Sequence, residues 1–261
     1  METLYSLAEL PLHVIAIIFI SLGIGLSTIG VLLVNNYVVT AQLIENNFVA
    51  GFKFTYLAQV FTGILAFVLI EQSARYSNAS AYVNNELNAI GYFDQAMAGL
   101  SGPEAEDVRK AVRAYVKSVV DDEFPAMARG NESVESSRKF KDMFAAYAKI
   151  APIDARESAI IFSANQMLMR VSDNRTGRLS AASGRLQALL WTTIFVGLFA
   201  SIAWNWFFGS NNLVAQLVMG SLLTTANVMT VYYLFIAAFP FIGELGIGPE
   251  GWKEFLDLPY P

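Results

Sequence analysis

Long apolar segments interrupt the sequence at four places, and each predicts a membrane-spanning helix. About 20 predominantly apolar residues in a helix are enough to cross the hydrocarbon core of a bilayer. The segments lie at about residues 12–34, 54–71, 188–208 and 213–239. Together they indicate that lipid is the solvent for much of the chain.

A long polar stretch separates the second apolar segment from the third. Residues 72–187 hold 15 of the 17 Lys and Arg residues and 14 of the 22 Asp and Glu residues, which predicts a water-facing domain. Turn and break signals occur at Pro103, Gly130 and Pro152. They predict four helices, at about 72–99, 103–129, 132–149 and 153–187.

These patterns predict an all-α membrane protein with four transmembrane helices. A helical cytoplasmic domain is expected between spans two and three. The expected parts are the first two spans, the helical domain, the last two spans and a C-terminal tail, over residues 1–71, 72–187, 188–243 and 244–261.

Composition excludes several classes of function. The residues are 55% hydrophobic and 15% charged, and the net charge of −5 gives no basic surface for a nucleic acid. The chain has no cysteine and one histidine, His13, so thiolate and zinc sites are not expected. Neither a phosphate-binding loop nor a Ser/His/Asp set occurs, and we expect no cofactor and no enzymatic activity.

Basic residues close to the spans predict the orientation in the membrane. Arg75 follows span two, and several arginines precede span three, whereas the opposite side has only Lys53. Lys and Arg near span ends favour the cytoplasmic side. We therefore expect the helical domain and both termini in the cytoplasm.

Span two carries the candidate pore-lining residues. Val60, Ile64 and Phe67 share one helical stripe, which could form a hydrophobic constriction, and Glu71 could shape ion flow at the end of the span. Ordinary packing or lipid contact, with Glu71 marking the membrane boundary, explains the same pattern. The spans also contain neutral polar residues, explained equally by hydrogen bonds between helices and by a conduction path: Gln59, Thr62, Asn205, Gln216, Thr224, Thr225 and Asn227.

Arginines before span three form a candidate anion-attracting flank. Arg175, Arg178 and Arg185 could lie among headgroups or line a vestibule that attracts anions. A cytoplasmic helix next to a membrane carries such charge in any case, so both interpretations stay open. The acidic run Asp121–Glu123 is interpreted as a helix end, because adjacent side chains on a helix do not converge on a metal ion.

Three sequence phrases resemble the bestrophin-like domain family of mainly bacterial membrane proteins of unknown function. They are AYVKSVVDDEFPAMARG, RVSDNRTGRLSAASGRLQALLW and YLFIAAFPFIGELGIGPEGWKEFL, starting at Ala114, Arg170 and Tyr233. The last contains the family's signature turn, here Pro240, Phe241 and Gly243. The resemblance covers about residues 54–257.

The resemblance implies an architecture related to that of bestrophins, which are pentameric anion channels with four membrane helices and a helical cytoplasmic region. We therefore expect a multi-pass protein of the bacterial inner membrane that forms a homo-oligomer. The leading hypothesis is an anion channel whose pore is lined by span two, with the lipid bilayer, further copies and small inorganic anions as partners. The alternative is a non-conducting sensor or scaffold whose cytoplasmic domain binds a partner protein.

Overall fold

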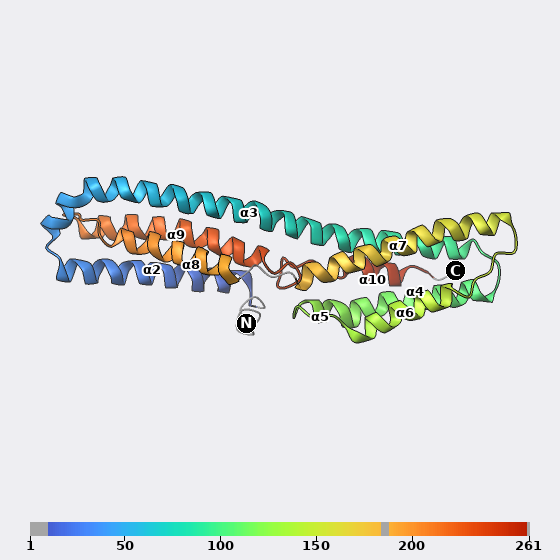
Figure 1. Cartoon of the computed structure of the whole chain (residues 1–261). Coiled ribbons are helices and arrows are strands. Elements are labelled where there is room, and N and C mark those ends of the chain that lie inside the picture. The colour runs from blue at the N-terminus through green and yellow to red at the C-terminus, as the bar shows by residue number, and fades with distance from the viewer. Residues whose placement is uncertain (1–9, 184–187, 260–261) are drawn as a thin grey trace. The chain divides into compact units, whose positions relative to one another are not determined.

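The computed structural model describes residues 10–183 and 188–259, and its regular structure over these residues is helical, without a β-strand (Figure 1). This confirms the all-α class. The chain divides into two compact units. Unit 1 comprises residues 1–74 and 186–238, and unit 2 comprises residues 75–185 and 239–261. The long helix α3 (Thr40–Ala98) supplies residues to both.

Unit 1 contains the apolar helices. Figure 1 shows α2 (Leu12–Tyr37), α8 (Ala188–Asn205) and α9 (Leu213–Ala237) alongside the first part of α3. The helices α2, α3 and α9 are long and apolar enough to cross a membrane, whereas the apolar part of α8 is shorter. The helix that contains predicted span two begins well before residue 54, at Thr40.

The turns at one end of unit 1 are fixed by amide side chains. Asn212 caps α9, because its Oδ1 accepts a hydrogen bond from the backbone N–H of Ala215 at 3.1 Å. Asn47 of α3 both donates to the carbonyl oxygen of Gly209, at 2.8 Å, and accepts from its N–H, at 2.9 Å. The turn between α8 and α9 is thereby tied to α3.

Small residues let the helices of unit 1 approach closely. A Cβ at Gly30 of α2 would lie 2.1 Å from the indole of Trp206, and one at Gly23 would lie 2.7 Å from Val228 of α9. In lipid, close packing of this kind drives helix association, because burial from lipid gives no hydrophobic gain. An apolar cluster completes the contact, with the α3 side chains Phe61, Leu65 and Val68 packed against α8 and α9.

Unit 2 is a bundle with its own core. It contains the rest of α3, α4 (Pro103–Ser118), the π-helical turn η1 (Val119–Glu123), α5 (Phe124–Met127), α6 (Val134–Tyr147), α7 (Ala155–Ser183) and α10 (Glu250–Asp257). The core draws on most of these elements, with Phe93, Tyr115, Met143 and Leu168 among its fully buried members.

Local sequence explains where the helices of unit 2 begin. Gly102 has a φ of +118° and directly precedes Pro103, the first residue of α4. Asp154 accepts from the N–H of Glu157 at 2.6 Å, and Glu157 accepts in return from the N–H of Ile153 at 3.0 Å. The two carboxylates thus satisfy backbone donors at the start of α7.

The structure differs from the expected single helix over residues 103–129. That stretch divides into α4, η1 and α5, and Pro125 stands at the second position of α5. Proline has no N–H, so an uninterrupted helix would lose a hydrogen bond and its ring would meet the preceding turn. The wider π-helical turn accommodates the break and turns Glu123 into the core.

Residues 244–261, expected as a tail, contain the packed helix α10. Its Trp252 is 1% exposed and lies in the core of unit 2. The guanidinium of Arg113 donates to the carbonyl oxygens of Leu256 and Leu258, at 3.2 and 3.0 Å. A segment of eight residues has too short a helical pattern to be recognised in the sequence, and contacts with the bundle decide its structure.

The glycines of α2 give a direct test of the packing in unit 1. We expect Gly30→Ala to lower the stability by about 1–3 kcal/mol, because the added methyl group meets the indole of Trp206. Gly25→Ala is the matched control on the same helix, since nothing lies within 4 Å of its added Cβ. Thermal unfolding of both variants in detergent measures the difference, and equal midpoints would contradict this packing.

Candidate functional site

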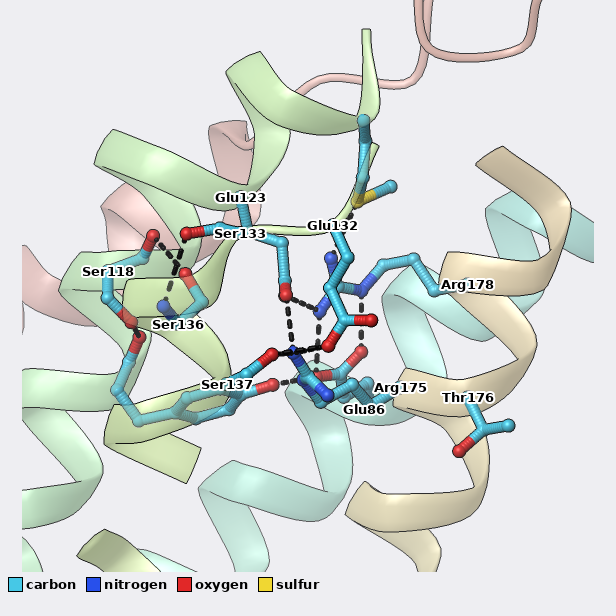
Figure 2. A network of polar contacts seen from close by, with 12 residues as sticks. Glu86, Ser118, Glu123, Glu132, Ser133, Ser136, Ser137, Arg175, Thr176 and Arg178 are labelled. Carbon is cyan, nitrogen blue, oxygen red and sulfur yellow. Dashed lines mark hydrogen bonds and ion pairs between the residues drawn. The ribbon is translucent and has the colours of Figure 1, made fainter. Parts of the chain in front are cut away.

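Two groups of polar side chains are candidates for function, one in each unit. The first is a buried ion cluster in unit 2, defined as Glu86, Glu123, Arg175 and Arg178. The second is a set of polar side chains on the exposed face of α3 in unit 1. Figure 2 shows Arg175 and Arg178 reaching from α7 toward the two glutamates of the ion cluster.

Arg178 lies at the centre of the ion cluster and is fully buried. Its Nε donates to Oε2 of Glu86, and its Nη2 donates to Oε2 of Glu123, each at 2.7 Å. Its Nη1 faces the sulfur of Met127 at 2.9 Å. Burial alone would lower the pKa of Arg178, and the adjacent charge of Glu86 raises it above its ordinary value, so the guanidinium stays ionised.

Arg175, one helical turn earlier, joins the cluster from its more open side. Its Nη2 donates to Oε1 of Glu123 at 2.6 Å and to the hydroxyl of Ser137 at 2.9 Å. The side chain of Glu132, 55% exposed, lies 3.4 Å from the same nitrogen. The guanidinium also stands 5.0 Å from the ring centre of Phe140, which suits a cation–π contact.

Tyr115 of α4 completes the cluster. Its hydroxyl donates to Oε1 of Glu86 at 2.5 Å. Burial raises the pKa of Tyr115 well above its ordinary value, and the charge of Glu86 raises it further, so the hydroxyl remains a donor. Two carboxylates and two guanidiniums leave the four charged groups without net charge. The ion cluster ties α3, η1 and α7 together, and Tyr115 links α4 to it. A neutral, filled arrangement of this kind favours a structural role over ligand binding.

The structure does not support the predicted anion-attracting flank at the described positions. Arg175 is 9% and Arg178 0% exposed, and carboxylates already neutralise both. An ion in solution therefore meets little of their positive charge. Arg185 lies outside the described residues.

The acidic run lies in η1, between α4 and α5, and not at the helix end that its sequence predicts. Asp121 and Asp122 face solvent, whereas Glu123 points into the ion cluster. Among the residues that the structure describes, no group of His, Asp or Glu side chains is arranged to hold a metal ion.

Sequence analysis missed Glu86 and Tyr115, although a signal for Glu86 exists. Core residues of α3 recur at heptad spacing, and Glu86 occupies the position between Val83 and Ile90 in that series. On α7, Arg175 and Arg178 continue the corresponding series from Leu168 and Val171. A charged residue at a core position of a helix requires a partner, so this pattern indicates ion pairs inside the bundle.

The signature turn lies against the core of unit 2. Phe241 is buried, and its ring lies 6.4 Å from that of Phe124 in an edge-on arrangement. Gly243 has a φ of +77°, a conformation that favours glycine, and the N–H of Ile247 closes the turn on the carbonyl oxygen of Pro240 at 2.7 Å. The structure of the turn therefore explains two of its residues: Phe241 packs against the core, and Gly243 allows the backbone conformation.

The predicted pore-lining residues do not form one uniform surface. Val60 and Phe67 are exposed, at 47% and 69%, whereas Ile64 is half-buried against the apolar cluster of unit 1. Glu71 is also half-buried. The predicted stripe therefore follows the edge of the exposed face of α3.

A second stripe runs along the exposed face itself. We define the polar stripe as Thr55, Gln59, Thr62 and Ala66, all exposed. They are spaced by four, three and four residues along α3. Because successive residues of an α-helix are about 100° apart around its axis, all four lie within an arc of about 60°. A shallow groove of about 420 Å³ follows the first three, flanked by Phe54 and Ala58.

Unlike Gln59 and Thr62 of the polar stripe, polar side chains on α8 and α9 form hydrogen bonds to neighbouring segments. Asn205 donates to Ser27 of α2 at 3.4 Å, and Asn227 donates to Ser201 of α8 at 2.9 Å. Gln216 donates to the carbonyl oxygen of Phe208 at 2.5 Å. These contacts favour the first of the two explanations, hydrogen bonding between helices, for α8 and α9 but not for the polar stripe.

The ion cluster makes neighbouring acidic residues differ in their effect on stability. We expect Glu123→Gln to lower the free energy of unfolding by about 3–5 kcal/mol, because two buried guanidiniums lose one of their counter-charges. Asp122→Asn makes the same charge change at an exposed neighbour, and we expect an effect within about 0.5 kcal/mol. Denaturant unfolding of the full chain in detergent compares them. Equal losses would show that the cluster does not hold unit 2 together.

Comparison with known proteins gives a match to a family. The family described as the bestrophin-like domain matches residues 22–252, nearly the whole chain. No curated protein and no solved structure matches. The match includes α3, α9, the larger part of α2 and the signature turn at Pro240. The chain therefore belongs to the bestrophin-like domain family, and it is a membrane protein.

Proposed function

We propose that this protein assembles with further copies in the membrane and conducts small inorganic ions along a pore lined by α3. The observation that supports the proposal is the uncovered polar stripe of α3 within an otherwise apolar span. Polar groups exposed to hydrocarbon are costly, so a face of this kind requires water or protein against it. One helix per subunit cannot enclose a pore in a monomer, so the proposal requires an oligomer.

The proposed topology follows the sequence prediction. In it, α8 acts as a fourth span together with α2, α3 and α9, and the large helical region lies in the cytoplasm of a bacterial cell, at the inner membrane. Exposed Arg75 and Arg170 support this orientation, since basic residues beside spans favour the cytoplasmic side.

Anions are the ions that we propose to pass through the pore. The polar stripe offers hydroxyl and amide donors and no carboxylate. The architecture that the family shares with bestrophins points the same way. The basic flank before span three contributes little to this preference, because Arg175 and Arg178 are paired with Glu123.

Two measurements on the purified protein test the proposal. We expect a mass in nanodiscs corresponding to several copies, and a chloride flux in liposomes well above that of empty vesicles. Potassium flux in the same vesicles is the comparison for charge selectivity. Oligomeric protein without any flux would rule out conduction, and a monomer would rule out a pore lined by α3.

A non-conducting sensor or scaffold is the second candidate, and one feature of unit 2 favours it. A groove of about 380 Å³ runs between α3 and α7, lined mostly by polar side chains. Asn88, Tyr92 and Arg170 lie in it, and all three are exposed. A stable protein partner recovered by crosslinking at this groove, together with absent flux, would select this function.

A further inference from the structure

The polar stripe stands out against the other exposed helix faces of unit 1. On α9, the most exposed large side chains are Val214, Met219 and Leu222, and on α2 they include Leu22 and Ile29. Aliphatic surfaces of this kind suit lipid tails. The exposed face of α3 also has apolar members, such as Tyr56 and Phe67, but one stripe of it carries threonine, glutamine and alanine through the middle of the apolar stretch.

The stripe also has unused hydrogen-bonding groups. Thr55 donates to the carbonyl oxygen of Gly51 at 3.0 Å within its own helix. In the described part of the chain, the side chains of Gln59 and Thr62 make no hydrogen bond. An amide or hydroxyl left without a partner in hydrocarbon costs several kcal/mol. Their stable environment in a membrane is water or the polar surface of another protein.

The apolar residues beside the stripe favour a second copy as the neighbour. Val60 and Phe67 lie about 100° around the helix from the stripe, at 100° per residue. On the opposite side of the stripe, Leu65 is buried against the chain's own α8 and α9. One edge of α3 is therefore covered within the chain, and the other edge is apolar and exposed.

A ring of copies gives a suitable neighbour to each of the three surfaces of α3: the polar stripe, the edge covered by α8 and α9, and the exposed apolar edge. When each α3 turns its polar stripe toward a common axis, the covered edge lies on the chain's own helices. The exposed edge with Val60 and Phe67 then meets the next copy in a head-to-tail contact, which closes into a ring when the rotation permits. The polar side chains converge on the axis, where water hydrates them.

We infer that Thr55, Gln59 and Thr62 line a water-filled path at the centre of such a ring and hydrate the passing ion with neutral donors. The inference rests on the proposed function and deepens it, since it names the side chains that the ion meets. It also differs from the sequence prediction, in which Val60 and Phe67 line the pore. Here these two residues contact the next copy instead. Amide and hydroxyl groups replace part of the hydration shell of an ion without binding it tightly, as conduction requires.

The absence of cysteine makes the inference testable in the otherwise unchanged full chain. Single substitutions T55C, Q59C and T62C are placed on the stripe, and L222C on the exposed face of α9 is the lipid-facing control. The proteins are reconstituted in liposomes and treated with a charged, membrane-impermeant thiol reagent. Thiols react as thiolates, which form in water and not in hydrocarbon, so we expect stripe positions to react about tenfold faster than L222C, or more.

Two further substitutions locate the contact between copies. We expect V60C and F67C to react slowly with the charged reagent. In a head-to-tail contact each of them faces a different residue of the next copy. With a short bifunctional thiol crosslinker, we therefore expect linked copies from T62C, whose counterparts converge on the axis, and none from L222C. Modification of T62C should also change the ion flux.

The outcomes separate the inference from the proposed function. Flux with stripe positions that react no faster than L222C would overturn the inference and leave conduction in place. Rapid reaction at V60C and F67C with a slow stripe would place the water path on the other edge, again overturning it. Rapid reaction along the stripe without any flux would support a hydrated central face and reject conduction.

Discussion

Every polar group that leaves water in this protein needs a partner, and this constraint organises both units. In unit 2, the fully buried Arg178 is held by carboxylates from two other elements, Glu86 of α3 and Glu123 of η1. Breaking one of these pairs would leave a charge without compensation in the core. In unit 1, amides meet hydroxyls or carbonyls of neighbouring helices, as Asn227 meets Ser201. On the polar stripe of α3, the side chains of Gln59 and Thr62 have no such partner within the described chain.

Sequence patterns predicted the helices better than their partners. Runs of apolar residues and the breaks at Pro103 and Pro152 place most helices, because these signals are local. By sequence, Arg178 is a candidate for the anion-attracting flank because its position along the chain is close to a span. Its partner Glu86 is 92 residues away, and a count of charges along the chain does not detect such a pair. Heptad spacing of core residues was the available signal.

The sequence also does not predict which face of α3 is left uncovered by the other helices. Val60, Ile64 and Phe67 form an apolar stripe by spacing alone, and so do the residues that pack inside the unit. Which face remains open depends on where α8 and α9 lie, and that is a property of the folded chain. The packing of α10 also depends on tertiary contacts, through Trp252.

The pairing of the buried arginines bears on what kind of pore this protein can form. Fixed positive charges at a pore entrance attract anions over a distance of about 10 Å, the screening length at moderate salt. Because Arg175 and Arg178 are neutralised by Glu86 and Glu123, they supply little of that field. Neutral hydroxyl and amide dipoles can turn either end toward an ion. The proposed preference for anions therefore rests on the absence of carboxylates from the stripe, and size and the cost of dehydration decide among anions.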